Sequence, residues 1–269
     1  MGSVVRSLMG RLARAGLFLV LCVITITPVT ACCGHTTAIV AAPVVDARNL
    51  AERAEAKSVA LLNPESGGAM CGGVWVSEYE VLSAFHCVKN LGRPVQAEDM
   101  LEQLLESLGM PGVAPLWDPT GQALQYMVKD GSKDVVVVER FDRNHDLALL
   151  RVKDPVKMPA HDVASVSMRE IRDGDPVDVV GSTGGMPLTY SRCYVASVRE
   201  PIPEAEGKGF KTVQLSGPVY AGNSGGPAFD SGGGLIGIDD FMKVDSNGPI
   251  PGMSFFVHRD IVKVFLAQK

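Results

Sequence analysis

The sequence predicts an all-β protein, built as a barrel or a sandwich. From Lys57 onward the chain is a succession of short apolar runs separated by Gly, Pro, Asp and Asn, which is typical of strands joined by turns. Helices do not alternate with these runs, and this favours a barrel or sandwich over a parallel sheet. The 269 residues are 46% hydrophobic, so the chain can bury a substantial core.

Ten runs have the composition of strands. They cover residues 57–63, 72–77, 80–85, 134–141, 147–152, 175–181, 190–198, 212–217, 234–238 and 253–257.

Two segments instead have apolar residues at helical spacing. The first, residues 98–109, lies in a stretch from Gly92 to Gln125 that we interpret as an insertion between strands. The second, residues 258–269, is expected to form a C-terminal helix that docks on the body through one stripe. The stripe consists of Ile261, Val262, Phe265 and Leu266. A Leu-rich stripe such as that of residues 98–109 usually packs on its own domain.

The first 31 residues have the order of an export signal. Arg6, Arg11 and Arg14 precede the apolar run 15–31, which is short for a membrane-spanning helix and contains a proline. We expect this leader to be cleaved, with a signal anchor as the alternative. Residues 32–56 are interpreted as a linker.

The end of the leader, Val29-Thr30-Ala31-Cys32, resembles the lipobox of bacterial lipoproteins. This resemblance implies lipidation of Cys32 and a membrane tether through its acyl chains; an ordinary signal-peptidase site is the alternative. Either way the mature protein is expected in the bacterial cell envelope, lipid-anchored, periplasmic or secreted. The net charge of −5, without a basic stripe, argues against nucleic acid as a partner.

The cysteines fit an oxidising compartment. Cys71 and Cys87 flank a histidine-bearing loop and could form a disulfide, whereas Cys193 has no obvious partner. Cys193 is interpreted as a buried free thiol, with pairing to Cys33 as the alternative.

Three dispersed residues together suggest nucleophilic catalysis. Serine needs a neighbouring base, a group that orients the base, and donors for the oxyanion. Ser224 lies in the run GNSGGP, His86 follows a predicted strand in SAFHCV, and Asp146 precedes one in NHDLALL. The N–H groups of Gly222 and Ser224 are the candidate oxyanion donors. The remaining histidines show no metal-ligand spacing, so no metal or cofactor is expected.

These motifs, with CGGVWVS from Cys71, resemble the chymotrypsin-like serine peptidase family, whose order His, Asp, Ser they share. The resemblance implies two packed antiparallel six-stranded barrels, residues 57–160 with the insertion 92–125 and residues 161–269 with the terminal helix. It also implies a disulfide between Cys71 and Cys87.

By the same resemblance, the chain is a serine endopeptidase that hydrolyses peptide bonds through an acyl-enzyme intermediate. Ser224 would be the nucleophile, His86 the general base and Asp146 the group that orients the imidazole. The histidine and aspartate would come from the first barrel and the serine from the second.

Within this family the chain resembles the HtrA-type bacterial branch, with two departures. The chain ends at Lys269 without room for the usual PDZ domain, and the branch usually lacks a disulfide at Cys71 and Cys87. Trypsin-like zymogens carry an Asp before the serine that pairs with a newly cut N-terminus, whereas this chain has Asn223. We therefore expect activity without proteolytic activation.

The resemblance also implies a substrate pocket with Pro218 at its floor. Its walls would be formed by Asp240, Phe241, Met242 and Gly252. Because the floor is uncharged, we expect a small or medium apolar P1 side chain rather than Arg or Lys. Asp239 and Asp240 stand where relatives usually have neutral residues, and each is either a solvated turn acid or a group that alters the pocket.

Two other functions fit parts of the pattern. An α/β-hydrolase elbow needs a helix after the serine, and Gly225-Gly226-Pro227 would break one. The other alternative is a catalytically silent envelope protein that binds peptides or unfolded chains. Such a binder has no need to keep the three dispersed residues. The oligomeric state does not follow from the sequence.

Overall fold

The computed structural model describes residues 47–93, 117–200, 209–246 and 248–268. The predicted leader, Cys32, Cys33 and the predicted helix over residues 98–109 lie outside this part of the chain. Among the described residues, no helix combines the length and the hydropathy that crossing a membrane requires.

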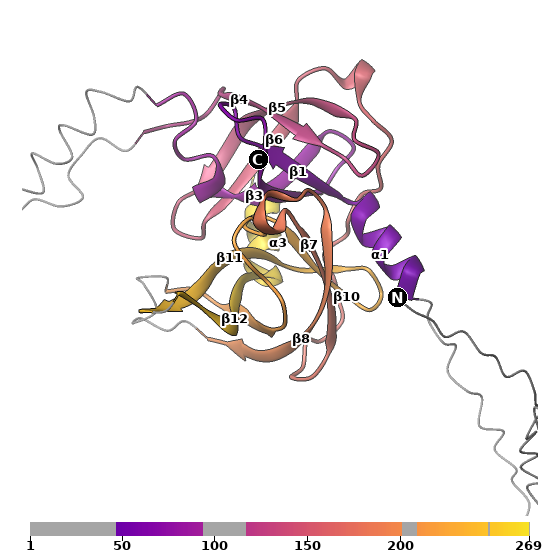
Figure 1. Ribbon diagram of the computed structural model, residues 1–269, viewed down its shortest axis with the longest axis vertical. Coiled ribbons are helices and arrows are strands. Elements are labelled where there is room, and N and C mark those ends of the chain that lie inside the picture. Colours follow the sequence, from indigo (N-terminus) through magenta and orange to yellow (C-terminus); the bar gives the residue numbers. More distant parts are fainter. Residues whose placement is uncertain (1–46, 94–116, 201–208, 247, 269) are drawn as a thin grey trace, which may run out of the picture. The chain divides into compact units, whose positions relative to one another are not determined.

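The strands form two closed antiparallel barrels of six strands each, which confirms the predicted fold class (Figure 1). In the order in which they pair, the strands of the first barrel are β1 (Ser58–Leu62), β2 (Ala69–Trp75), β3 (Glu80–Ala84), β6 (Leu147–Val152), β5 (Lys133–Asp142) and β4 (Ala123–Met127). Those of the second are β10 (Pro227–Asp230), β11 (Leu235–Asp245), β12 (Gly248–His258), β9 (Thr212–Ser216), β8 (Thr189–Arg199) and β7 (Pro176–Gly181).

Short helical segments complete the described chain. They are the α-helices α1 (Ala47–Ala56) and α3 (Arg259–Ala267) and the 3₁₀ turns η1 (Phe85–Cys87), η2 (Pro155–Lys157) and η3 (Thr183–Gly185).

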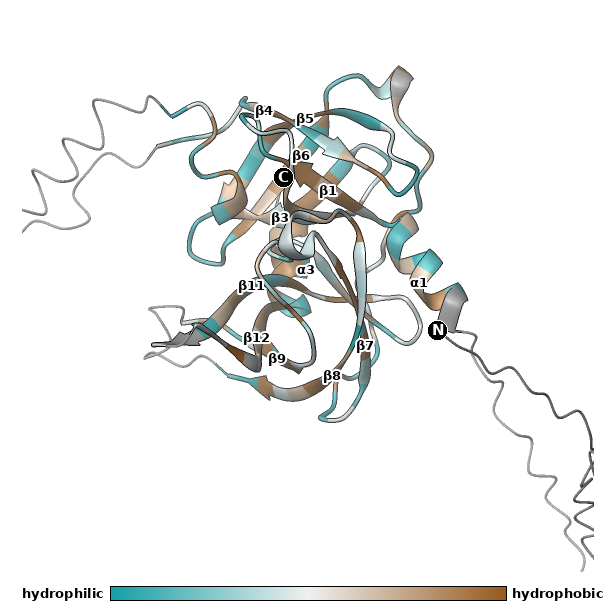
Figure 2. Cartoon of the chain, in the orientation of Figure 1, coloured by the Kyte–Doolittle hydropathy of each residue, from teal (hydrophilic) through white to brown (hydrophobic). Residues whose placement is uncertain are grey.

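Three apolar clusters hold this architecture together. One fills the first barrel around Trp75 and Tyr126, and another fills the second around Val213 and Phe256. The third lies between the barrels and joins residues of both, such as Leu147 of β6, to the helix α3. Figure 2 shows hydrophobic residues concentrated on the strands and hydrophilic ones in many of the turns, whereas α1 carries both kinds. Burial of the third cluster fixes one barrel against the other.

Three elements differ from the sequence-based prediction. The helix α1 occupies the last ten residues of the predicted linker 32–56, because Leu50 and Ala54, four residues apart, bury one face on the body. Strand β4 begins inside the predicted insertion 92–125 and closes the first barrel against β1 and β5. Strand β10 has four residues and starts with a proline, so it lacks the alternating pattern that marks a strand.

The C-terminal helix docks on the body as predicted. Val262 and Phe265 are buried, and they join the cluster between the barrels. Arg140 of β5 donates a hydrogen bond to the Phe265 carbonyl oxygen at 2.8 Å and stacks its guanidinium 4.2 Å from the Phe265 ring. The helix therefore binds both barrels.

The first turn of α3 depends on a buried histidine. His258 is 3% exposed, and its Nδ1 accepts a hydrogen bond from the Asp260 backbone N–H at 3.1 Å. An accepting Nδ1 must be unprotonated. Burial lowers the pKa of His258 to about 4, while the neighbouring Asp260 opposes this decrease.

Acid is therefore expected to weaken the fold through His258. Between pH 6.5 and 4 the unfolded state binds a proton that the folded state does not, so the stability from this group is complete above pH 6.5 and is lost as pH falls toward 4. Between pH 7 and 4.5 we expect a loss of about 2 kcal/mol from this residue. His258→Asn keeps a side chain that can accept the capping hydrogen bond but cannot take up a proton. Between pH 7 and 4.5, the free energy of unfolding in urea should therefore fall by about 2 kcal/mol less in this variant than in the wild type. Equal losses in both proteins would contradict this origin.

Candidate active site

His86 lies on a short turn that is fixed at both ends. It is the middle residue of η1, directly after β3, and the Phe85 N–H donates to the Asp146 carbonyl oxygen at 3.0 Å. The following residue, Cys87, is joined to Cys71 of β2 by a disulfide, which was expected from the resemblance. These bonds hold the backbone of His86 on both sides.

Asp146 is bonded to His86 by two hydrogen bonds, one from the backbone and one from the imidazole. The His86 backbone N–H donates to Oδ1 at 2.9 Å, and Nδ1 of the ring lies 2.6 Å from Oδ2. Asp146 is buried and has a φ of 53°, in the left-handed region that is uncommon for residues other than glycine. Such strained positions persist where the surroundings over-determine them, and they cluster at functional sites.

Ser224 is held by contacts from both barrels. The Gly72 N–H, in the first barrel, donates to the Ser224 carbonyl oxygen at 2.8 Å, and the next residue, Gly225, donates its N–H to the Asp239 carbonyl oxygen of the second barrel at 2.8 Å. The sulfur of Cys87 lies 3.6 Å from the same carbonyl oxygen of Ser224.

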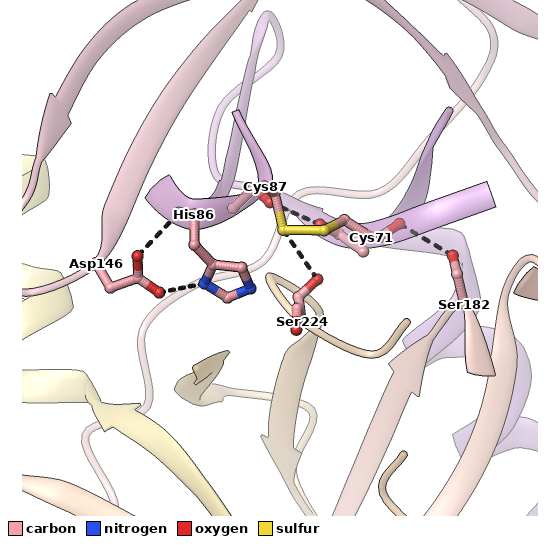
Figure 3. The surroundings of a disulfide bond; sticks show 8 residues. Cys71, His86, Cys87, Asp146, Ser182 and Ser224 are labelled. Atoms are coloured by element: carbon pink, nitrogen blue, oxygen red, sulfur yellow. Dashed lines mark hydrogen bonds and ion pairs between the residues drawn. A yellow bond between two sulfur atoms is a disulfide. The ribbon is translucent and has the colours of Figure 1, made fainter. Parts of the chain in front are cut away.

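Figure 3 shows the His86 ring between Asp146 and Ser224, with its second nitrogen on the side of Ser224. Within the described residues, the Ser224 hydroxyl makes no hydrogen bond to His86; such bonds are often long without substrate. The structure thus brings the three predicted residues to the junction of the barrels.

Gly222 and Ser224 present two backbone N–H groups beside the serine. In the part of the chain that the structure describes, neither group donates to another protein atom. Gly222 has a φ of 97°, and a Cβ at this position would lie 2.1 Å from the Ser182 carbonyl oxygen. Only glycine fits there, so the turn that exposes these donors depends on it.

Asn223 anchors the same loop inside the second barrel. It is 1% exposed, and its Oδ1 accepts a hydrogen bond from the Thr183 hydroxyl at 2.7 Å. The Asn223 side chain is therefore buried and hydrogen-bonded to η3 within the intact chain.

The predicted pocket residues lie in three segments, the loop before Ser224 and the paired strands β11 and β12. Pro218 is exposed in the loop before Ser224, and Gly252 lies in β12 with a φ of 75°. Phe241 of β11 stacks on Phe255 of β12 with ring centroids 4.6 Å apart, and Met242 is half-buried beside it.

Asp239 and Asp240 are not solvated turn acids, because both are 3% exposed within β11. Burial, followed by repulsion from Asp240, raises the pKa of Asp239 well above its ordinary value. The Asp240 carboxylate, the Asp146 carboxylate and a ring nitrogen of His86 all lie within 4.8 Å of one another. The comparison with the family shows that Asp240 stands where relatives usually have a neutral residue. It does not show that Asp240 lies beside His86 and Asp146, because that depends on the register of β11.

Cys193 is a buried free thiol in the structure. Burial raises its pKa to about 11, with a smaller contribution from the charge of Asp239. A thiol with so high a pKa is inert as a nucleophile at neutral pH.

Two groups of side chains bring metal-ligating atoms within 4.8 Å of one another among the described residues. In the first, Cys71 and Cys87 are tied up in the disulfide beside His86. In the second, His86 and Asp146 are hydrogen-bonded to each other next to Asp240. Neither group has the four ligands of a structural zinc site.

Two closed antiparallel six-stranded barrels with a C-terminal helix are the architecture of chymotrypsin-like proteins. A family model described as the trypsin-like peptidase domain matches residues 71–238, more than half of the chain. The chain therefore belongs to the trypsin-like peptidase family.

Curated relatives are HtrA-type proteases. The chain is 30% identical over 148 residues to a "Probable periplasmic serine endoprotease DegP-like" of Brucella suis, a match that covers 55% of this chain and 28% of the relative. It is 26% identical over 149 residues to the human "Serine protease HTRA4". This match covers 55% of this chain and 30% of that protein. The chain thus spans less than a third of the length of these relatives.

Solved structures share the fold. An "HtrA-type protease AlgW with tripeptide" superposes with a TM-score of 0.61 at 18% identity, covering 82% of this chain and 62% of that one. Deg5 superposes with a TM-score of 0.56 at 19% identity, covering 81% of this chain and 90% of that one.

Proposed function

We propose that the chain is an exported serine endopeptidase that cleaves peptide bonds with Ser224, His86 and Asp146. The observation that carries the proposal is the double hydrogen bond from His86 to Asp146, which leaves the second ring nitrogen on the side of Ser224. Membership of the trypsin-like peptidase family supports it, as do the names of the relatives.

The chemistry follows from the protonation that Asp146 imposes. A carboxylate accepts hydrogen bonds only, so Nδ1 of His86 carries the proton and Nε2 has the free lone pair. Nε2 takes the proton of the Ser224 hydroxyl while the Ser224 oxygen forms a bond to the substrate carbonyl carbon. The same proton then passes to the leaving amine as the carbon–nitrogen bond breaks. Water repeats the sequence on the acyl-enzyme and releases the acid.

The N–H groups of Gly222 and Ser224 would stabilise the oxyanion. They lie on the loop that Gly72 and Thr183 anchor, and they have no competing acceptor within the described residues. Loss of one such donor typically lowers kcat about 100- to 1,000-fold.

The contact between Thr183 and Asn223 supports activity without proteolytic activation. In a zymogen, the loop before the serine is ordered by a new charged N-terminus. Here the Asn223 side chain is already buried and hydrogen-bonded in the intact chain.

For the substrate we propose peptides with a small or medium apolar P1 side chain. Pro218 offers no charge, and the stacked Phe241 and Phe255 give the neighbouring wall an apolar surface. For location we propose the cell envelope, because the leader has the order of an export signal and relatives are named periplasmic. A lipid anchor at Cys32 belongs to the same proposal.

The decisive experiment is covalent labelling with a serine-directed phosphonate probe that carries a small apolar side chain. We expect one label per chain on Ser224, and mass spectrometry of the digest locates it. Ser224→Ala should abolish the label, whereas the matched control Ser66→Ala, at an exposed serine in the turn between β1 and β2, should retain it. Folded wild-type protein that takes up no label would refute the peptidase and favour the peptide-binding alternative.

A further inference from the structure

Asp240 is a buried acid that the proposed mechanism does not use. It lies in β11 of the second barrel, where the pairing with β12 shifts register between Asp239 and Phe241. The side chains of Asp146 and His86 reach it from the first barrel, so that donor atoms of all three lie within 4.8 Å of one another. The Asp240 carboxylate therefore lies beside that of Asp146, in addition to its predicted place in the substrate pocket.

Two carboxylates this close and this well buried repel each other strongly. Asp146 is 6% exposed and Asp240 is 3% exposed, so water screens little of the repulsion. Buried carboxyl pairs relieve such repulsion by retaining one proton between them.

The hydrogen bonds decide which of the two acids is ionised. Asp146 accepts from the His86 backbone N–H at 2.9 Å and from Nδ1 at 2.6 Å, and bonds of this kind favour the charged form. The proton is therefore expected on Asp240. A protonated carboxyl is a hydrogen-bond donor, which a second carboxylate is not.

We propose that Asp240 is a positioning residue that stays protonated at neutral pH and donates a hydrogen bond to Asp146, so that the pair carries a single negative charge. The proposal rests on the proposed peptidase function for its kinetic consequences but not for the location of the proton.

Two ionisable side chains of the described residues lie beside this pair. His86 approaches it from η1, and Asp239 directly precedes Asp240 in β11. The pKa of Asp239 is raised first by burial and then by Asp240, with a smaller contribution from Asp146. An acid whose pKa is raised in this way keeps its own proton, so Asp239 adds little charge beside Asp240.

The proton can be located without any activity. In protein labelled with ¹³C-aspartate, the side-chain carboxyl resonance of Asp240, assigned by its loss in Asp240→Asn, is expected at the position of a protonated acid at pH 7. An Asp240 that is ionised at pH 7 in the folded protein would overturn the proposal. Because this measurement needs no substrate, it separates a failure of this inference from a failure of the peptidase function.

Kinetics test the hydrogen bond itself. Asp240→Asn keeps a neutral donor of the same shape, so kcat should stay within about threefold of the wild type. Asp240→Leu has a similar volume and no donor, and it should lower kcat about 10- to 100-fold at unchanged KM, as expected for loss of a hydrogen bond to a charged group. Active-site titration with the phosphonate probe corrects each rate for folded enzyme.

Three results would contradict this role. They are an unchanged kcat in Asp240→Leu, an equal loss in Asp240→Asn and Asp240→Leu, and a change in KM alone, which would make Asp240 only a wall of the pocket. The matched control is Asp239→Asn, at an equally buried acid of the same strand. It should leave kcat within about threefold, because Asp239 lies outside the group formed by His86, Asp146 and Asp240.

Discussion

Asp146→Asn is expected to lower kcat about 10,000-fold while the protein remains folded. In the wild type, Oδ1 accepts from the His86 backbone N–H at 2.9 Å and Oδ2 faces Nδ1 of the ring at 2.6 Å. The side chain of an asparagine has one oxygen, and this oxygen would accept the hydrogen bond from the His86 backbone N–H. Its NH₂ group then faces Nδ1 and forces the proton of the ring onto Nε2. A histidine in this tautomer cannot accept the proton of Ser224.

Steady-state kinetics with a peptide chosen from a cleavage library measure this effect, and KM should change little because Asp146 does not touch the substrate. The chain offers a matched control in Asp142, whose carboxylate accepts from the His145 backbone N–H and lies 2.6 Å from His145 Nδ1. Asp142→Asn should retain kcat within about threefold, since His145 is not part of the proposed site. An Asp146→Asn variant within tenfold of the wild type would refute the role given to Asp146.

Removal of the disulfide is expected to destabilise the protein by about 3 kcal/mol. Cys71 and Cys87 are 16 residues apart in sequence, and closing a loop of this size removes about that much conformational freedom from the unfolded chain. Both cysteines also contribute to the core of the first barrel. The double variant Cys71→Ala/Cys87→Ala should therefore unfold at lower urea concentration, and its kcat/KM should fall because the turn that carries His86 loses its covalent tether.

A reducing agent separates the bond from the loss of two sulfur atoms. It should lower the unfolding midpoint of the wild type and leave that of the double variant unchanged. Cys193→Ala is the matched control, because it removes a buried sulfur that is not in a disulfide. If the wild type and the double variant unfold at the same urea concentration, the disulfide contributes no stability.

Much of the fold followed from local patterns. The alternating or continuous apolar runs of β1, β6 and β7 identify them as strands, because burial in a barrel imposes those patterns. β4 and β10 were missed because closure of a barrel, rather than local composition, makes them strands. α1 was missed because only Leu50 and Ala54 mark its buried face within a polar segment.

Part of the candidate site could likewise be predicted from local motifs, and part of it could not. His86, Asp146 and Ser224 are visible in the sequence because each lies in a short motif that its backbone geometry requires, such as the glycines around Ser224. Asp240 is visible only as an unusual residue. Its neighbours Asp146 and His86 lie in the other barrel, and their distance from it depends on a shift of strand register that no local motif records.

The hydrogen bond from the Gly72 N–H to the Ser224 carbonyl oxygen joins the proposed nucleophile to the first barrel, although Ser224 itself belongs to the second. A Cβ on Gly72 would lie 2.7 Å from the Gly226 Cα, so the two backbones meet without space for a side chain. Any force or ligand that separates the two barrels would break this hydrogen bond. The proposed activity would therefore depend on the contact between the two barrels, and loss of activity would indicate that they have separated.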